Sequence, residues 1–516
     1  MKVLLMHRNC DFRLGEGLPP SAGELTQDLE LDTLFDAMAA GDGYLREAAK
    51  NAVLASVSEP ETILYRQQAL ADCLEFPKVA REIYAIAVDA IQREKRVWSV
   101  MWDRYPEAAL HRATEVLRIF VKPLRRLWQI ATDESLGFRS EAFTRLFAMI
   151  ASELDGEYMQ SIEEYLERLE FHSGVLMSAE LGSDCKGTNY ILRKQSERNQ
   201  SWLEWLQGWV SGLAGRTDSV HVYEVDDRDE AGFRALGDLR VQGIRHVASA
   251  LAQSTDHILS FFNMLRLEMG FYISCINLHE QMTRKREPLC MPQPFLPGQR
   301  KFQCSGLYDI CLSLRVAERV VGNDVAGDGR SLVMITGANR GGKSTFLRSA
   351  GLAHLMMQCG MFVPAEAFHA DLCQGVFTHF KREEDATMKS GKLDEELARM
   401  SAIIEKIIPH SLVLLNESFS STNEREGSEI ARQIVRALLQ TEVKIFYVTH
   451  MFDLAEGFYR ERTKDALFLR AERLEDGRRT FLLPEGEPLP TSYGEDLYMR
   501  IFEPDREPAA DACSQG

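Results

Sequence analysis

The sequence feature that most restricts the fold is the segment at positions 337–344, which reads Gly-Ala-Asn-Arg-Gly-Gly-Lys-Ser and fits the pattern G-x-x-x-x-G-K-[ST]. It follows the apolar, strand-like run at 332–336, and a helix-like stretch opens at Thr345. Glycines in such a loop let backbone N–H groups surround phosphate oxygens, and the helix N-terminus adds a positive dipole. The segment therefore predicts a nucleotide site in which Lys343 reaches the β- and γ-phosphates and Ser344 binds Mg²⁺.

Two further apolar runs end in polar residues that suit phosphate chemistry. The run SLVLLNE ends at Asn416 and Glu417, where such ATPases carry Asp-Glu, with the Asp in the Mg²⁺ shell and the Glu polarising water. Asn416 can hydrogen-bond a metal-bound water but supplies no charge, so Glu417 is the candidate base. The run KIFYVTH ends at His450, which can sense the γ-phosphate. A buried structural Glu and a structural His are the competing interpretations.

The same runs indicate the fold class. They alternate with helix-like stretches, which is typical of a parallel sheet flanked by helices. Upstream, apolar residues recur at helical spacing, and a long helix is expected from about 244 to 282. The proline-rich segment EPLCMPQPFLPGQRKFQ separates the two patterns. We therefore predict an α/β P-loop ATPase domain, with a parallel sheet flanked by helices, preceded by a mainly helical domain.

This reading gives four consecutive parts: an N-terminal segment at 1–30, a mostly helical domain at 31–285, a linker at 286–302 and an ATPase domain at 303–516. Within the helical part, the segments 174–194 and 219–225 are expected to be extended. A tryptophan-rich stripe at 202–213 is interpreted as a packed helix face, with a base-stacking platform as the alternative.

Composition restricts the partners and the compartment. The net charge of −17 gives no bulk attraction to nucleic acid, so DNA contacts must come from local basic clusters at 93–96, 122–126 and 284–286, unless these are only solvated faces. No run approaches 18 uncharged apolar residues, so we expect no membrane span. The ten cysteines form no C-x-x-C pair, which argues against a zinc site or disulfide framework and predicts a cytoplasmic protein.

Taken together, several segments resemble the ATPase domain of the MutS family of DNA mismatch-repair proteins. TGANRGGKSTFLRSAGLAHLMMQCGMFVPAEAF, VFTHF, SLVLLNESFSSTNEREGSEIA, VTHMFDLA and TSYG occur in the family's order, over about 300–500. Upstream, SEPETILYRQQALADCLEFP at 58–77 resembles the start of the family's helical core domain. The helix expected at 244–282 then corresponds to the lever helix that enters the ATPase domain.

The resemblance implies ATP and Mg²⁺ as ligands, with catalysis by Glu417 and γ-phosphate sensing by His450. The phosphate and metal contacts that it assigns are Gly337, Asn339, Gly341, Gly342, Lys343, Ser344 and Thr345, with Asn416 beside Ser344 at the metal.

The resemblance also implies a base contact and a dimer. The segment 321–324 occupies the place of the family's adenine-contacting loop, so Asn323 is a candidate base contact. In the family, the loop after the catalytic Glu acts on the partner subunit's nucleotide. Here that loop is 418–427, with Asn423 at the position of the signature serine. A homodimer with composite ATP sites is therefore expected.

Three departures from the family's pattern bear on turnover. Gly-Pro-Asn-Met is Gly-Ala-Asn-Arg here, the Asp of Asp-Glu is Asn416, and the Gly-Arg-Gly-Thr-Ser signature is Phe-Ser-Ser-Thr-Asn at 419–423. Loss of one carboxylate from a metal shell slows such a reaction by about 10- to 1000-fold, because one well-placed electrostatic group contributes a few kcal/mol. We also expect no N-terminal mismatch-recognition domain with its aromatic wedge.

The leading hypothesis is a nucleotide-gated clamp on DNA in repair or recombination that recognises DNA structure, such as a branch or junction, and does not recognise mispairs. The alternative is an ATP-binding switch or interaction protein with little turnover that acts through a protein partner. An unrelated P-loop enzyme acting on a small molecule is the third reading. Glu417 and His450 favour the first, because a protein that only binds ATP needs neither.

Overall fold

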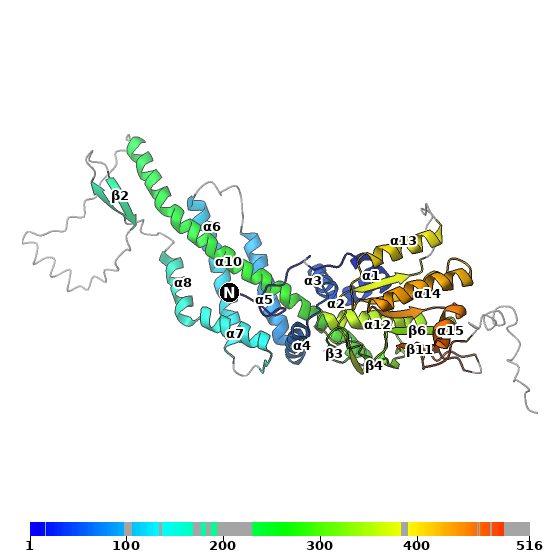
Figure 1. Ribbon diagram of the computed structural model, residues 1–516. Helices are drawn as coiled ribbons and strands as arrows, with labels where there is room; N and C mark the ends of the chain where they lie inside the picture. Colours follow the sequence, from blue (N-terminus) through cyan, green and yellow to red (C-terminus); the bar gives the residue numbers. More distant parts are fainter. Residues whose placement is uncertain are drawn as a thin grey trace, which may run out of the picture. The chain divides into compact units, whose positions relative to one another are not determined.

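The computed structural model describes residues 1–15, 17–97, 106–133, 137–168, 177–181, 187–192, 230–382, 391–461, 463, 465–474 and 477–489 (Figure 1). The chain forms two compact units that interleave along the sequence. The first comprises Met1, Ile86–Asp133 and Ala148–Asn263, and the second Lys2–Ala85, Glu134–Phe147 and Met264–Gly516. The consecutive domain boundaries given above stay a prediction.

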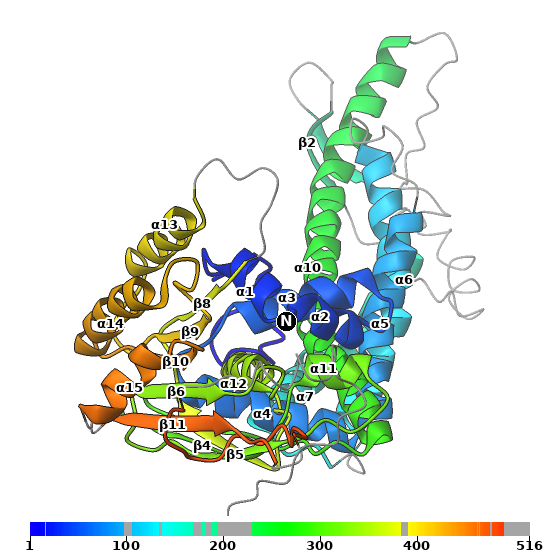
Figure 2. The same cartoon turned by 90° about the vertical axis from the view of Figure 1, so that its right-hand side faces the viewer.

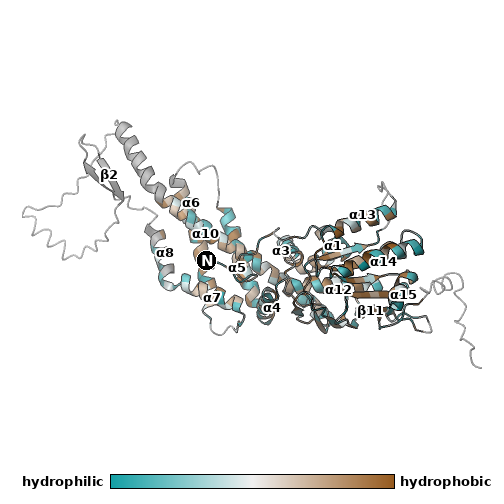
Figure 3. Ribbon diagram, viewed as in Figure 1, coloured by the Kyte–Doolittle hydropathy of each residue, from teal (hydrophilic) through white to brown (hydrophobic). Residues whose placement is uncertain are grey.

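The second unit is built on a five-stranded sheet with the order β11-β6-β10-β9-β8, in which all neighbours are parallel. Its strands are apolar and almost entirely buried, as expected for a parallel sheet covered on both faces, and they are brown in Figure 3. The prediction of a parallel sheet is confirmed. The strands are β6 (Leu332–Gly337), β8 (Val376–Phe380), β9 (Leu412–Asn416), β10 (Lys444–Val448) and β11 (Ala466–Ala471).

Helices cover both faces of this sheet because successive strand residues point to opposite sides. Met334, Leu415 and Tyr447 belong to a buried cluster with apolar side chains of α13 (Lys392–Ile404), α14 (Glu424–Gln440) and α15 (Phe452–Arg460). The helix α12 (Lys343–Gln358) packs on β6, β9 and β10 with its own apolar side chains buried. Figure 2 shows α12 and the α14–α15 pair on opposite sides of the sheet.

A second, four-stranded sheet in the same unit has the order β3-β7-β4-β5. β4 is antiparallel to β5 and β7, and β3 is parallel to β7. β3 lies inside the segment 286–302 that was expected to be a linker, so that segment contributes backbone pairing to the sheet. The strands are β3 (Gln293–Phe295), β4 (Phe302–Leu307), β5 (Asn323–Ala326) and β7 (Ala367–Asp371).

The N-terminal part of the chain belongs to the second unit. Leu5, Met6 and Phe12 are buried, and the backbone N–H groups of all three donate to the carboxylate of Glu268. The N-terminal segment is thus part of the core of this unit. The helices that accompany it are α1 (Ala22–Asp28), α2 (Leu31–Ala39), α3 (Gly43–Leu54), α4 (Pro60–Glu75) and α11 (Ile310–Arg315).

The first unit is mainly helical where it is described. The long helix expected at 244–282 is confirmed as part of α10 (Glu230–Lys285), whose 56 residues extend about 84 Å at 1.5 Å per residue. α10 begins in the first unit and ends in the second. The helices α5 (Pro77–Arg96) and α7 (Glu141–Glu153) begin in the second unit and end in the first. The remaining helices are α6 (Pro106–Ala131) and α8 (Gly156–Arg168).

The antiparallel hairpin of β1 (Met177–Leu181) and β2 (Gly187–Leu192) confirms the extended structure expected within 174–194, as far as those residues are described. The expected strand at 219–225, the tryptophan stripe at 202–213 and the TSYG segment at 491–494 lie outside the described residues. No helix among the described residues is long and apolar enough to cross a membrane.

Candidate nucleotide site

The phosphate-binding loop joins β6 to α12, as its sequence context predicts. β6 ends at Gly337 with φ 103°, and α12 is capped by Gly342 with φ 89°. Both angles are in the region that L side chains rarely adopt. A Cβ on Gly337 would also lie 2.8 Å from the backbone nitrogen of Ala471 on β11. The two glycines therefore let the loop turn tightly at the carboxyl edge of the sheet.

Lys343 places a positive charge inside this loop. The residue is 6% exposed, and its Nζ donates hydrogen bonds to the carbonyls of Gly337 at 2.8 Å and Ala338 at 3.0 Å. Burial lowers the pKa of Lys343, whereas the nearby Glu417 carboxylate raises it. The ammonium is thus held where backbone N–H groups and a helix N-terminus also favour an anion.

Ser344 and Asn416 are brought together from positions far apart in the sequence. Ser344 is the second residue of α12, and Asn416 ends β9. The Ser344 hydroxyl lies 2.9 Å from Asn416 Oδ1 and donates a hydrogen bond to it. Hydroxyl and amide oxygens suit Mg²⁺, which keeps several waters and takes further ligands from substrate phosphates. Among the described residues, no group of three or more His, Cys, Asp or Glu side chains could hold a metal ion by itself.

Glu417 and His450 lie at the same edge of the sheet. Glu417 follows β9 and His450 comes two residues after β10, and the carboxylate Oε2 is 4.0 Å from His450 Nδ1. Their side chains are 33% and 40% exposed, respectively. Glu417 adopts φ 53°, and its backbone N–H donates to the Val448 carbonyl at 2.9 Å. Both side chains are therefore beside the loop and accessible, as a base and a phosphate sensor require.

The loop after Glu417 is anchored in the core. Ser418 is fully buried, its hydroxyl oxygen lies 2.7 Å from the His379 carbonyl oxygen, and its own carbonyl accepts a hydrogen bond from the Tyr447 hydroxyl at 2.7 Å. The His379 ring lies with Nδ1 2.7 Å from Ser418 Oγ and donates from Nε2 to the Glu396 carbonyl at 2.9 Å. Burial lowers the pKa of His379 to about 4, so this histidine is neutral. Sequence reasoning missed this support for the position of Glu417.

The other loop residues have mixed roles. Asn339 is exposed, and its carbonyl accepts a hydrogen bond from Arg479 Nε at 2.8 Å. The Gly341 N–H donates to the Ala338 carbonyl at 3.2 Å, and the Thr345 carbonyl accepts from Ser349 at 2.8 Å. Their phosphate contacts stay a prediction, but all three positions belong to the same loop and first helical turn.

Asn323, the candidate base contact, is 6% exposed and uses its amide within the protein. Its Nδ2 donates to the Phe481 carbonyl at 3.2 Å, and its Oδ1 accepts from Leu483 N at 2.8 Å. Phe481 is 47% exposed, and its Cβ lies 3.5 Å from where a Cβ on Gly342 would stand. Asn323 therefore fixes an exposed aromatic residue next to the phosphate-binding loop. No signal in the sequence had marked Phe481.

Asn423, at the position of the signature serine, is the N-cap of α14. Its Oδ1 accepts from Glu426 N at 3.0 Å, and its Nδ2 lies 3.2 Å from Glu426 Oε2. A role toward a partner's nucleotide stays a prediction.

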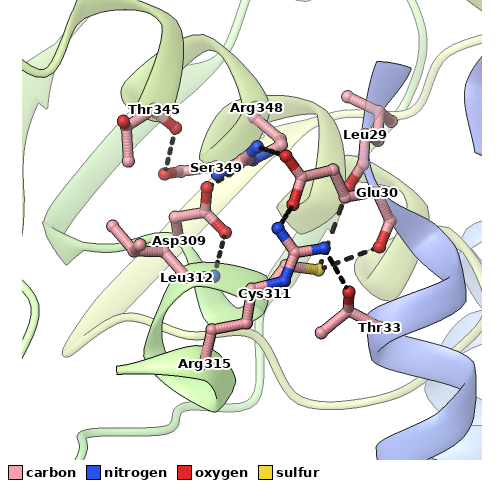
Figure 4. A network of polar contacts seen from close by, with 10 residues as sticks. All are labelled: Leu29, Glu30, Thr33, Asp309, Cys311, Leu312, Arg315, Thr345, Arg348 and Ser349. Atoms are coloured by element: carbon pink, nitrogen blue, oxygen red, sulfur yellow. Dashed lines mark hydrogen bonds and ion pairs between the residues drawn. The ribbon is translucent and has the colours of Figure 1, made fainter. Parts of the chain in front are cut away.

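One turn further along α12, Arg348 joins the loop's helix to other elements of the second unit (Figure 4). Its guanidinium donates to the carboxylates of Asp309 and Glu30, and Asp309 is completely buried. Arg315 also pairs with Glu30 and donates to the Thr33 hydroxyl at 2.7 Å. These contacts fix the orientation of the helix that presents Lys343 and Ser344.

Comparison with known proteins identifies this arrangement. Residues 333–494 match MutS domain V, and residues 58–285 match the MutS2 N-terminal domain. The chain belongs to the MutS family. MutS domain V is an ATPase domain, so this member carries a nucleotide-binding ATPase domain in its second unit.

Individual MutS relatives match over the ATPase region. The chain is 37% identical to the DNA mismatch repair protein MutS of Thermus aquaticus over 24% of the chain and 15% of that protein. It is 36% identical to the MutS of Thermotoga petrophila over 28% of the chain and 18% of that protein. It is 28% identical to the MutS protein homolog 4 of Mus musculus over 33% of the chain and 17% of that protein. The match thus spans less than one fifth of the length of these curated relatives.

Proposed function

We propose that this MutS-family protein binds and hydrolyses ATP with Mg²⁺ and acts as a nucleotide-gated clamp on DNA in repair or recombination, recognising a DNA structure and not a mispair. The observation that carries the proposal is the placement of Glu417 4.0 Å from His450 at the carboxyl edge of the sheet, beside Lys343. A base, a phosphate-sensing imidazole and a phosphate-binding cation are the groups that phosphoanhydride hydrolysis needs.

The residues divide the work of hydrolysis among them. Lys343 and the loop N–H groups would bind the β- and γ-phosphates, and Ser344 and Asn416 would hold Mg²⁺, which would neutralise phosphate charge. Glu417 orients and deprotonates the attacking water, while His450 donates a hydrogen bond to the γ-phosphate. Asn323 would support the adenine base of the nucleotide indirectly, because its amide bonds the backbone of Phe481, whose exposed ring could stack on the adenine. Asn416 removes one charge from the metal shell, so we expect slow turnover.

We further propose that the protein forms a homodimer in which the loop 418–427 of each subunit completes the partner's ATP site. We also propose that this dimer acts in the cytoplasm. The cysteines among the described residues are free, which suits that compartment. ATP-dependent dimerisation is tested by light scattering of the purified protein with and without ATP. A monomer at all nucleotide concentrations would oppose composite sites.

DNA binding rests on family membership, because the basic clusters are partly neutralised. Arg93 pairs with Asp89 at 2.9 Å, and Arg125 pairs with Glu163 at 2.6 Å. Lys285 donates to the carbonyls of Ser313 and Val316. These pairings and the net charge of −17 favour the second candidate, an ATP-binding switch with little turnover that acts through a protein partner.

Steady-state ATP hydrolysis separates the two candidates. The purified protein is assayed with and without branched, mismatched and single-stranded DNA, beside Glu417→Gln and the control Glu442→Gln. Glu442 is exposed and lies just before β10, at the opposite end of that strand from His450. The clamp is supported by DNA-stimulated turnover that is lost in Glu417→Gln and retained in Glu442→Gln. ATP binding without turnover and without response to any DNA would favour the switch.

A further inference from the structure

A hairpin arm follows β11 and returns to the phosphate-binding loop. The N–H of Glu472 donates to the Leu482 carbonyl at 2.9 Å, and that of Arg470 donates to the Pro484 carbonyl at 2.9 Å. An isolated bridge pairs Arg473 with Arg479. The described part of this arm, 470–474 and 477–486, therefore has a defined register in which Arg479 pairs with Arg473.

Arg479 is bonded directly to the loop backbone. Its Nε donates to the Asn339 carbonyl at 2.8 Å, and its Nη1 donates to the Gly477 carbonyl at 2.8 Å. A planar guanidinium held at two of its nitrogens has a fixed orientation, so little side-chain entropy is lost when the group binds an anion. Its charge also contributes to lowering the pKa of Lys343, after the larger effect of burial, so the two cations lie near each other.

The charge balance at the loop favours the same role. Asn416 provides no negative charge where ATPases of this kind carry an Asp, whereas Arg479 adds a positive charge on the side of Asn339. A polyphosphate gains from both changes, because guanidinium groups bind phosphate oxygens through charge-assisted hydrogen bonds.

We propose that Arg479 contacts the β- and γ-phosphates of the bound nucleotide from the hairpin arm, as a further binding residue of the ATP site. The proposal rests on nucleotide binding as proposed above. Arg479 acts in the same subunit as Lys343, and it approaches the phosphates from the Asn339 side of the loop. If Arg479 only attached the arm to the loop, its substitution would change the affinities for ATP, ADP and AMP by the same factor.

The first test measures equilibrium binding of ATP, ADP and AMP, each with Mg²⁺, to the full chain. Arg479→Gln should weaken ATP and ADP binding by about 5- to 30-fold, the range of one partly exposed charge-assisted hydrogen bond, and AMP binding by less than about twofold. The matched control is Arg478→Gln, because Arg478 is its exposed neighbour on the same arm. This control should leave all three affinities within about twofold.

Two results would overturn the proposal: Arg479→Gln binds ATP as the wild type does, or it loses AMP affinity as much as ATP affinity. The variant Lys343→Ala separates failure of the Arg479 contact from failure of nucleotide binding as a whole. If the wild type binds no nucleotide, the proposed function itself fails. If Lys343→Ala loses ATP binding and Arg479→Gln keeps it, the proposed function holds and only the role of Arg479 is wrong.

A second measurement uses only the wild-type protein and so does not depend on whether a variant folds. The wild-type protein is treated with phenylglyoxal, and modification of each arginine is followed by mass spectrometry. ATP should protect Arg479 at least about fivefold, AMP should protect it less than twofold, and Arg478 should react equally in both cases. Equal reactivity of Arg479 with and without ATP would refute a phosphate contact.

Discussion

The Ser344 hydroxyl donates a hydrogen bond to Asn416 Oδ1 across 2.9 Å, joining the first turn of α12 to the end of β9. An aspartate at 416 could accept the same hydrogen bond and would add a negative charge to the metal shell. We predict that Asn416→Asp lowers the Mg²⁺ concentration needed for half-maximal ATP turnover by about tenfold and raises turnover itself, because one well-placed charge contributes a few kcal/mol.

The control for this prediction is the double variant Asn416→Asp with Glu417→Gln, which should be inactive. Turnover that is unchanged or lower in Asn416→Asp would show that the neutral amide is adapted to this site.

Arg348 and Arg315 both pair with Glu30 but differ in their second partner. Arg348 also binds the fully buried carboxylate of Asp309, whereas Arg315 is 51% exposed and binds Thr33. Burial raises the pKa of Asp309, and Arg348 opposes that rise. Arg348→Met should therefore destabilise the protein by about 3 kcal/mol, since a buried charge loses its partner, and Arg315→Met by less than about 1 kcal/mol. Urea unfolding checks both values, and equal losses would contradict the argument.

Asn423 caps α14 within the loop 418–427. Removal of this cap by Asn423→Ala should cost about 1 kcal/mol of unfolding free energy, whereas Asn423→Ser should stay within about 0.5 kcal/mol, since serine caps helices equally well. Thermal unfolding of both variants measures the cap. If Asn423→Ser alone changes ATP turnover while stability is unchanged, the residue has a role beyond capping.

Glu268 should make the stability of the protein depend on pH. Burial raises its pKa from 4.5 to about 7, although three backbone N–H donors oppose the rise. Because the folded state keeps the proton that the unfolded state releases, this contribution is complete below pH 4.5 and is lost as the pH rises to about 7. The loss is about 3 kcal/mol.

The measurement is the difference in unfolding free energy between the wild type and Glu268→Gln at pH 5, 6, 7 and 8. The wild type should lose stability relative to the variant as the pH rises through 7, and the difference should level off towards pH 8. A constant difference would mean that Glu268 stays ionised throughout.

The sequence predicted those parts of the site whose position follows from local order along the chain. A strand, a glycine-rich loop and a helix must come together when they are consecutive, and residues that end neighbouring parallel strands must meet at one edge. The proximity of Lys343, Glu417 and His450 was therefore predictable, whereas their roles stay a prediction. Arg479 and Phe481 were missed because the hairpin arm returns to the loop from about 140 residues away in sequence. The strand β3 was taken for linker because its prolines favour a turn, yet β7 pairs with it at the edge of the second sheet.

The buried N-terminal segment also has a consequence for synthesis on the ribosome. Leu5 is bonded to Glu268, 263 residues later, and Arg66 joins the Met6 carbonyl to the Cys359 carbonyl, 293 residues after Arg66 itself. At about 5–20 residues per second, translation takes on the order of 13–50 s to deliver Glu268 after Leu5 has been made. Throughout that interval the buried apolar segment around Leu5 lacks Glu268, and Arg66 has the Met6 carbonyl but not yet the Cys359 carbonyl. Slower translation should lengthen the time for which this N-terminal segment of the nascent chain is without its packing partners.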